Sequence, residues 1–596
     1  MGRSTGLILT KTGYFLSKTQ LSPVTPCRVG IMNKTPFMKP ALLFLLLLLS
    51  ITPTQAQHAP SPTQIEAYAS IGRVWGFLKY YHPHVGNGTL NWDQILVEAL
   101  AASQDLAPQQ MCNRVIDQLL VTAGPVDECE VCFKAPGDQG ISTVNWQWME
   151  SSPFLTEDQA TALRRIRDQR DLGDSLHRAY LPNWQGVSLN FVMDSAYSDV
   201  ASFTKWHRLL PLYHYWNVIE YFFPYLQTAN PDWEQVLEDF IPRFLAAEGE
   251  RALQYTMWEL VNQVNDSHGG GGSAYLSEHG YGKYWLPFWA RLSDDRRVFI
   301  TELRNDSIGL ACGLKVGDEI LHINGTDIET LLAEKRPFEA ASNATAKDIY
   351  CLWLALKDTL PMATLKVARA DSVFDLEVPR FAVSELRANA YPDWYWADSQ
   401  QTVIVARANR LISRRKARDF MKEASHADAI VLDFRMGAMP YEARNYLYPR
   451  MLPQNQLAVT AAHPSRSFPG NWMDNQLQYT PERQRSFWDT LILLAGEYNI
   501  SQDEWVIMYF QTSPRAYTIG RPTGGALGYM ARIEMPGRFA AYFTSGYMSY
   551  PDGSPVFGPG VKLDEQVEPT AEQLSQGRDA EVERALQYLQ SQTDQP

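Results

Sequence analysis

The sequence predicts a multidomain α+β chain with a helical N-terminal region, a β-rich middle domain and a C-terminal α/β domain. Three observations support this. The 596 residues are too many for one hydrophobic core, and their composition, 45% hydrophobic and 12% aromatic, is that of a globular protein. A helical pattern occurs twice in the first half. Strand and helix patterns alternate in the last third, which is typical of an α/β sheet.

Residues 1–56 have the features of a secretory signal peptide. They hold no acidic residue, Met38 and Lys39 precede an apolar run over 41–49, and small residues lead to a cleavage point after Ala56. The run is too short to span a bilayer stably, and translation could start at Met38. We therefore expect an exported protein, periplasmic or extracellular, without a stable membrane span after cleavage. An uncleaved anchor is the alternative.

The chain is acidic, with a formal net charge of −13. Residues 1–56 carry six basic residues, so their removal would leave a charge of −19. This charge argues against nucleic acid or an anionic membrane surface as a partner. Protein or peptide partners are expected, and an oligomer is possible.

The cysteines predict no metal site. Cys129 and Cys132 form a C-x-x-C pair, but no second pair or histidine cluster completes a zinc site, so a local disulfide is the better interpretation. Cys112, Cys312 and Cys351 lie in apolar contexts that predict buried thiols. No cofactor is predicted.

A helix-Pro-helix module is repeated in the first half. Trp75, Tyr80, Pro83 and Trp92 recur, 141 positions later, as Trp216, Tyr221, Pro224 and Trp233. This spacing predicts a duplicated helical domain, with module 1 and a connection over 62–200 and module 2 over 201–280. Module 2 ends in Asp266-Ser267-His268 and four glycines, a loop whose backbone can approach another chain segment closely.

The middle domain, residues 284–380, has short strand patterns around the run from Gly313 to Gly325 (GLKVGDEILHING). This stretch resembles a PDZ domain. The resemblance implies that an extended peptide adds to a sheet edge, with Leu286 and Phe288 near the loop that would bind its carboxylate.

The C-terminal domain, residues 395–590, offers a candidate nucleophile. The apolar strand pattern over 491–495 breaks at Gly496, and Ser501 then precedes a helix pattern over 505–510. A serine at a strand-to-helix junction is the layout of a nucleophile elbow. The alternative is a simple helix N-cap, because the run from Ser501 to Glu504 (SQDE) also fits a capping box.

Further elements are expected in this domain. The predicted strands are 402–406, 429–434, 516–519, 531–534 and 539–544, and the predicted helices are 414–424 and 441–451. We expect these strands to form one α/β sheet, with the site at the carboxyl ends of the strands.

His268 is the best candidate for a general base. Histidine is the usual base for a serine nucleophile, and this one lies on a glycine-rich loop at a helix end. The alternative is a structural histidine.

The order of these parts resembles the C-terminal-processing (tail-specific) serine protease family, including the tricorn protease core, over about residues 216–589. The stretches that carry the resemblance are Asp-Ser-His, the PDZ-like run, ADAIVLDFR, EYNISQDEW, IGRPTGGALG and DGSPVFGPGVKLDEQVEPT. It implies a core with a crotonase/ClpP-like sheet and Ser501 as nucleophile. Ala526 stands where lysine-dyad members carry their lysine. The His-dependent branch therefore applies, with His268 as base and Ser267 as an auxiliary hydrogen-bonding group.

The sequence departs from the family at the group that should orient the imidazole. The position where relatives place a carboxylate holds Val556 or Phe557. Glu504 matches an accessory glutamate of the lysine-dyad members, and we expect it to substitute.

A second departure concerns the oxyanion hole. Where relatives carry a glycine pair, this chain has Met439-Pro440, and proline has no amide proton. We expect one donor to shift to Gly437 or Ala438, and the Gln502 amide to supply the other.

The resemblance implies an exported serine endopeptidase that cleaves proteins or peptides by acyl transfer, with the substrate captured by the PDZ domain. The alternative is a catalytically impaired relative that serves as a peptide-binding scaffold, which Met439-Pro440 and Phe557 favour. A third interpretation is an architectural likeness with another reaction.

Overall fold

The computed structural model describes residues 59–126, 141–169, 179–183, 186–191, 199–386, 391–465, 468–481 and 490–593. The signal peptide predicted over 1–56 and the pair Cys129 and Cys132 lie outside these residues. Cys112, Cys312 and Cys351 are buried, as predicted. Within the described part of the chain, no helix combines the length and apolarity needed to cross a membrane.

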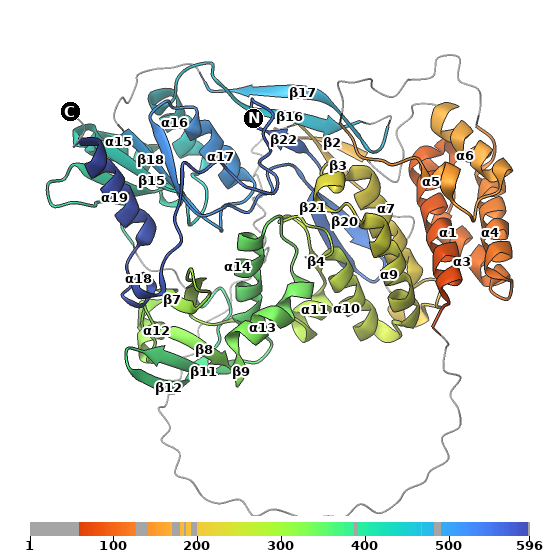
Figure 1. Cartoon of the computed structure of the whole chain (residues 1–596), viewed down its shortest axis with the longest axis horizontal. Helices are drawn as coiled ribbons and strands as arrows, with labels where there is room; N and C mark the ends of the chain where they lie inside the picture. Colours follow the sequence, from red (N-terminus) through yellow and green to blue (C-terminus); the bar gives the residue numbers. More distant parts are fainter. Residues whose placement is uncertain are drawn as a thin grey trace, which may run out of the picture.

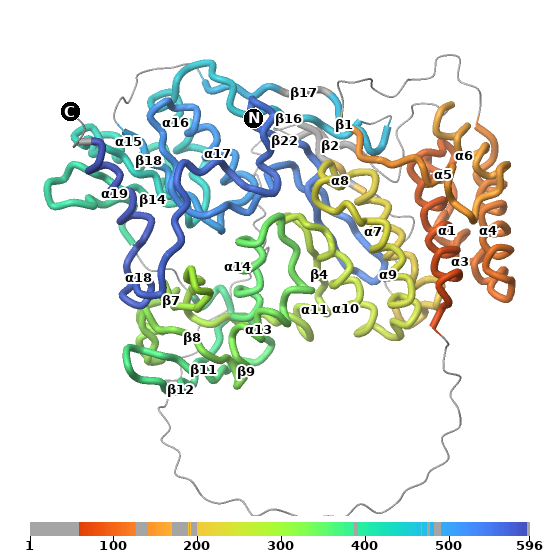
Figure 2. Tube along the Cα trace, viewed as in Figure 1, coloured from red at the N-terminus to blue at the C-terminus, as the bar shows by residue number. Residues whose placement is uncertain are grey.

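Two helical units occupy one end and the middle of the molecule (Figures 1 and 2). The first contains α1 (Pro62–Tyr81), α2 (Pro83–Gly86), α3 (Trp92–Ser103), α4 (Pro108–Ala123), α5 (Trp148–Ser151) and α6 (Glu157–Gln169). The second contains α7 (Leu209–Phe222), α8 (Leu226–Ala229), α9 (Trp233–Ala246), α10 (Gly249–Val261) and α11 (Ala274–His279). Helix α1 begins at a capping box formed by Ser61 and Gln64, and Pro62 fits its first turn.

Each helical unit contains the same pair of tryptophans joined by two reciprocal hydrogen bonds. The Trp75 indole nitrogen donates to the Trp92 carbonyl (3.2 Å), and the Trp92 indole nitrogen donates to the Trp75 carbonyl (3.1 Å). Trp216 and Trp233 make the equivalent reciprocal pair at 2.9 and 3.2 Å. All four side chains are buried, as the repeat predicts for core residues.

The middle domain forms a sheet of order β12-β11-β8-β7-β6, with α14 (Ala344–Ala355) packed against it. Its elements are β6 (Phe288–Leu292), β7 (Val298–Leu303), α12 (Asp306–Ala311), β8 (Glu319–Ile323), β9 (Thr326–Asp327), α13 (Ile328–Lys335), β11 (Met362–Arg369) and β12 (Ser372–Pro379). Strand β5 (Tyr284–Trp285), just before β6, and strand β10 (Lys357–Asp358), just after α14, form a separate antiparallel pair.

The C-terminal domain is built on a sheet of order β13-β14-β15-β18-β19-β23, parallel from β14 to β23. Its strands are β13 (Trp394–Trp396), β14 (Val403–Arg407), β15 (Ala429–Asp433), β18 (Thr490–Ala495), β19 (Ala516–Gly520) and β23 (Glu565–Gln566). Its helices are α15 (Arg414–Glu423), α16 (Tyr441–Met451), α17 (Gln502–Gln511), α18 (Ala571–Ser575) and α19 (Ala580–Thr593). The multidomain α+β prediction is confirmed.

One part of the predicted topology is wrong. The strands expected over 531–534 and 539–544 form β20 (Met530–Met535) and β21 (Phe539–Thr544), but they lie outside the parallel sheet. They belong to a separate sheet of order β2-β3-β20-β21-β4 whose apolar face packs on the helical core. Their alternating burial suits a sheet covered on one face, whereas strands of a parallel sheet are buried on both.

The short strands of this sheet are β2 (Ala179–Asn183), β3 (Gly186–Asn190) and β4 (Gly271–Gly272). A second sheet that was not predicted joins β1 (Ile141–Ser142), β17 (Asn471–Tyr479), β16 (Leu457–Pro464) and β22 (Tyr547–Ser549). Both sheets connect the helical region to the C-terminal domain, as Figure 1 shows.

Candidate active site

Ser501 lies in a sharp turn between β18 and α17, at the carboxyl edge of the parallel sheet. Its φ of 60° and ψ of −114° are rarely adopted by a residue with a side chain. Such strain at a strand-to-helix turn is a feature of the nucleophile elbow. The Ser501 amide donates to Glu504 Oε2 at 3.0 Å, which holds the strained turn in place.

Glu504 is buried and accepts three more hydrogen bonds. Thr523 Oγ1 and the Gly525 amide donate to Oε1 at 2.6 and 2.7 Å, and the Ala526 amide donates to Oε2 at 3.1 Å. Burial raises the pKa of Glu504 to about 7, and these donors oppose the rise. Glu504 therefore fixes the segment 523–526 against the turn of Ser501. The expectation that it orients His268 is not met, because its hydrogen bonds go to these four donors.

His268 lies in the loop between α10 and β4, whose glycines allow a close approach to β21. A Cβ on Gly271 would lie 2.4 Å from the Ala540 carbonyl oxygen, so only glycine fits. The antiparallel register pairs Gly272 with Ala540 and Gly271 with Ala541. Continued along the strands, the same register sets His268 opposite Thr544, the last residue of β21.

Thr544 and Asp266 hold the ring and backbone of His268. His268 Nδ1 lies 2.9 Å from Thr544 Oγ1, and Thr544 Oγ1 donates to Asp266 Oδ1 at 2.9 Å. The amides of His268 and Thr544 donate to Asp266 Oδ1 and Oδ2 at 2.9 and 2.5 Å. Asp266 and Thr544 are fully buried and His268 is 8% exposed.

Ser267 connects this loop to the nucleophile turn. Its Oγ donates to the Gly524 carbonyl at 2.5 Å, and the Gly524 amide donates to the Asn499 carbonyl at 2.6 Å, two residues before Ser501. Ser267 Oγ also accepts from the Ser342 amide at 2.9 Å. Its single proton is thus given to Gly524, so Ser267 acts as a clamp and not as the auxiliary group expected beside the reacting atoms.

The position where relatives place a carboxylate is apolar here. Phe557 stacks on Tyr225, with ring centroids 3.9 Å apart and an interplanar angle of 10°, and Val556 is fully buried. Sequence reasoning missed Thr544. Asp266 belongs to the Asp-Ser-His run, whereas Thr544 is the last residue of the predicted strand 539–544. The sequence does not show which strand pairs with that one.

The expected oxyanion donors Gly437 and Ala438 are engaged elsewhere. The Gly437 amide donates to the Phe434 carbonyl at 2.8 Å, and the Ala438 amide donates to the Asp503 carboxylate. Met439, in place of a glycine, is buried in the core of the domain and so fixes this loop. The Gln502 amide, the first of α17, has no acceptor among the described residues.

Leu286 and Phe288 do not form a peptide-binding surface. Both are buried in the core of the middle domain, at 0% and 1% exposure. The β5–β10 pair turns this segment inward, and the Leu286 amide donates to the Leu356 carbonyl at 3.1 Å. These two side chains are therefore not exposed to a peptide, and the role of the surrounding loop in binding a carboxylate stays a prediction.

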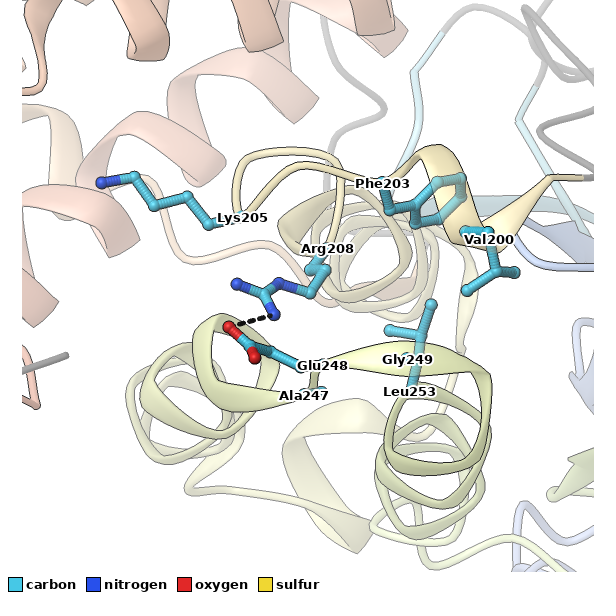
Figure 3. A pocket seen from close by; sticks show the side chains of 9 residues that line it. Val200, Phe203, Lys205, Arg208, Ala247, Glu248, Gly249 and Leu253 are labelled. Carbon is cyan, nitrogen blue, oxygen red and sulfur yellow. Dashed lines mark ion pairs between the residues drawn. The ribbon is translucent and has the colours of Figure 1, made fainter. Parts of the chain in front are cut away.

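Two cavities lie away from these residues. One, of about 350 Å³, lies where the segment 200–208 meets the start of α10, and Figure 3 shows Arg208 paired with Glu248 at its edge (3.6 Å). The other, of about 250 Å³, lies between Trp258, Phe338 and Lys357. None of the predicted site residues lines either cavity.

Comparisons with known proteins agree with this arrangement. Residues 407–567 match the model of peptidase family S41, and residues 281–347 match the model of the PDZ domain. No curated protein matches the chain significantly.

Among solved structures, mature CPAF complexed with lactacystin is similar at 13% identity, covering 66% of this chain and 99% of that one, with a TM-score of 0.52. Mature CPAF alone is similar at 13% identity, covering 67% and 99%, with a TM-score of 0.50. The photosystem II D1 C-terminal processing protease, at 13% identity, covers 63% and 98% with a TM-score of 0.38, which is too low to support an argument. The two CPAF structures show a shared fold. These matches show a serine-type peptidase that carries a family S41 peptidase domain over residues 407–567 and a PDZ domain over residues 281–347.

Proposed function

We propose that this peptidase cleaves proteins or peptides by acyl transfer at Ser501, with His268 as general base. The observation that carries the proposal is the bridge through Gly524. Its carbonyl accepts from Ser267, beside His268, and its amide donates to Asn499, beside the turn of Ser501. Two loops more than two hundred residues apart in sequence thus meet at one residue.

The chemistry follows from the two side chains. His268 Nε2 takes the proton of Ser501 Oγ as this oxygen attacks the substrate carbonyl, and the imidazolium then returns the proton to the leaving amine. Water, activated by the same nitrogen, releases the acyl group. The Gln502 amide and the N-terminus of α17 face the site where negative charge develops.

The finer parts of the proposal concern location and substrate. The signal-like residues 1–56 support export to a periplasmic or extracellular space. The PDZ domain would hold an extended segment of the substrate at its sheet edge. N-terminal sequencing of the secreted protein tests export: a start at Gln57 is expected, and a start at residue 1 or 38 would contradict cleavage.

A second function is favoured by a specific observation. Gly437 and Ala438 direct their amides at Phe434 and Asp503, so the oxyanion site has only one of its two expected donors, the Gln502 amide. Loss of one donor costs about a hundredfold to a thousandfold in kcat. A catalytically impaired scaffold that binds peptides is therefore the alternative.

A fluorophosphonate probe separates the two functions. Wild type should be labelled, and Ser501→Ala and His268→Ala should not. Ser425 and His426 form an exposed Ser-His pair far from the site in sequence, so Ser425→Ala and His426→Ala are matched controls that should label normally. A folded wild type that is not labelled would overturn the hydrolase and favour the scaffold.

A further inference from the structure

We propose that Thr544, held by Asp266, positions the imidazole of His268 in the tautomer that can act as a base. This inference rests on the proposed role of His268. The two residues would do through one intervening hydroxyl what a carboxylate does in direct contact with the ring.

The proton count at Thr544 supports this assignment. A threonine hydroxyl has one proton and can accept as well. Because Thr544 Oγ1 gives its proton to Asp266 Oδ1 (2.9 Å), the contact of 2.9 Å with His268 Nδ1 needs a proton on the ring nitrogen. Nδ1 is therefore the donor, and the lone pair of the neutral ring lies on Nε2, where a serine proton can be taken.

Asp266 is fixed in this role by the backbone on both sides. It accepts from the His268 amide through Oδ1 and from the Thr544 amide through Oδ2, so His268 is tied to it once, and Thr544 twice when its hydroxyl is counted. Both carboxylate oxygens already accept a backbone amide, and Thr544 Oγ1 is the donor in its bond to Oδ1. The hydroxyl is thereby forced to point at Asp266 and to accept from His268.

The same arrangement stabilises the charged ring. When His268 takes the proton of Ser501, its Nδ1–H bond to Thr544 is polarised, and the buried carboxylate of Asp266 lies one hydroxyl further along. Asp266 and Thr544 are both fully buried, so water does not screen this interaction.

The other titratable groups around this loop are satisfied by other partners. Glu504 of α17 accepts from four donors of its own segment, and Tyr350 of α14 is bonded to Ser267. Tyr215 of α7 and Tyr225 complete the set near Asp266, and the Tyr215 hydroxyl donates to the Val261 carbonyl. The variants below leave all of these unchanged.

The test compares Thr544→Val, which keeps the shape and removes the hydroxyl, with Thr544→Ser, which keeps the hydroxyl. We expect Thr544→Val to lower the maximum rate of fluorophosphonate labelling by roughly tenfold to a hundredfold, with little change in the probe concentration that gives half of this rate; the loss is part of the 10²–10⁴ that a general base contributes. Without the Thr544 hydroxyl, the imidazolium loses a hydrogen-bond acceptor and its charged form becomes less stable. The acid limb, which is the fall in the fluorophosphonate labelling rate at low pH, should therefore move to lower pH. Thr544→Ser should restore both quantities, and Thr460→Val in β16 should change neither.

The outcomes separate this inference from the proposed function. If wild type is labelled and Thr544→Val folds but keeps the wild-type rate and acid limb, the positioning role is overturned and the hydrolase stands. If Thr544→Val does not fold, Thr544→Ala is compared with Thr544→Ser, and equal acid limbs would overturn the role in the same way. A wild type that is not labelled at any pH would overturn both.

Discussion

The indole ring of Trp353 stacks on the phenol ring of Tyr498, with centroids 5.0 Å apart and an interplanar angle of 6°. Trp353 belongs to α14 of the PDZ domain, and Tyr498 lies three residues before Ser501. The Tyr498 hydroxyl also donates to the Ala290 carbonyl of β6, the edge strand of the PDZ sheet, at 3.4 Å. The segment that leads to the nucleophile is thus held by both the helix and the edge strand of the PDZ domain.

Replacing Trp353 should slow the reaction at Ser501. Trp353→Ala removes the surface on which Tyr498 rests, so the turn should become less ordered and the labelling rate should fall by about tenfold or more, since small displacements of a nucleophile are costly. Labelling kinetics and Tm check this. A variant with a lower Tm but an unchanged rate would show that the stack serves stability alone.

Arg291 should be essential to stability. It forms ion pairs with Glu497 (3.0 Å) and Glu581 (2.6 Å), both almost fully buried. Arg291→Met would remove the cation that the two carboxylates share and leave each with one arginine, Arg521 for Glu497 (3.3 Å) and Arg435 for Glu581 (3.0 Å). We expect a loss of up to about 3–5 kcal/mol in the free energy of unfolding. Denaturant unfolding measures it. The exposed pair of Arg418 with Asp419 is the control, because Arg418→Met should cost less than about 1 kcal/mol. Equal losses would contradict the prediction.

The contribution of Asp503 to stability should fall as the pH rises from about 4 to 7. Burial raises the pKa of Asp503 to about 7, above its unfolded value, so the folded state binds more protons than the unfolded state between about pH 4 and 7. The contribution is complete below the unfolded pKa and is lost as the pH approaches 7. Asp503→Asn should raise Tm by roughly 2–4 °C at pH 8 and by less at pH 5. An equal effect at both pH values would rule out this titration.

Glu504→Gln should impair both folding and labelling. The carboxylate accepts from four donors, and an amide nitrogen placed among them would face an N–H or O–H with a donor of its own. We expect a loss of about 1–3 kcal/mol and a slower reaction at Ser501. Thermal unfolding and labelling test this, with the exposed Glu334→Gln as control. An unaffected variant would show that the four bonds are dispensable.

Local patterns predicted most of the elements but few of the long-range contacts. The strand and helix on either side of Ser501 follow from an apolar run, a glycine and a helix pattern, and β18 and α17 lie there. His268 was found because its loop carries a recognisable run of residues. Thr544 was not, because its role depends on the register between β4 and β21, which a local pattern does not contain.

The misassigned residues have a common physical cause. Leu286 and Phe288 were placed by analogy with a peptide-binding loop, but both are large apolar side chains and pack into the core of their own domain. Glu504 was expected beside the imidazole because it matches an accessory glutamate of the lysine-dyad members. A buried carboxylate binds the nearest donors, and here those are the amides of the neighbouring loop.

The pairing of β4 with β21 makes the peptidase unit discontinuous in the chain. The stretch that matches family S41 begins at residue 407, whereas His268 arrives on a loop of the helical region that precedes the PDZ domain. A fragment cut to the boundaries of the matched domain would contain Ser501 without the base that we propose for it. Two separately expressed halves, divided between the helical region and the PDZ domain, should each be inactive, and should react only after reassociating through the β4–β21, β3–β20 and β1–β17 pairs.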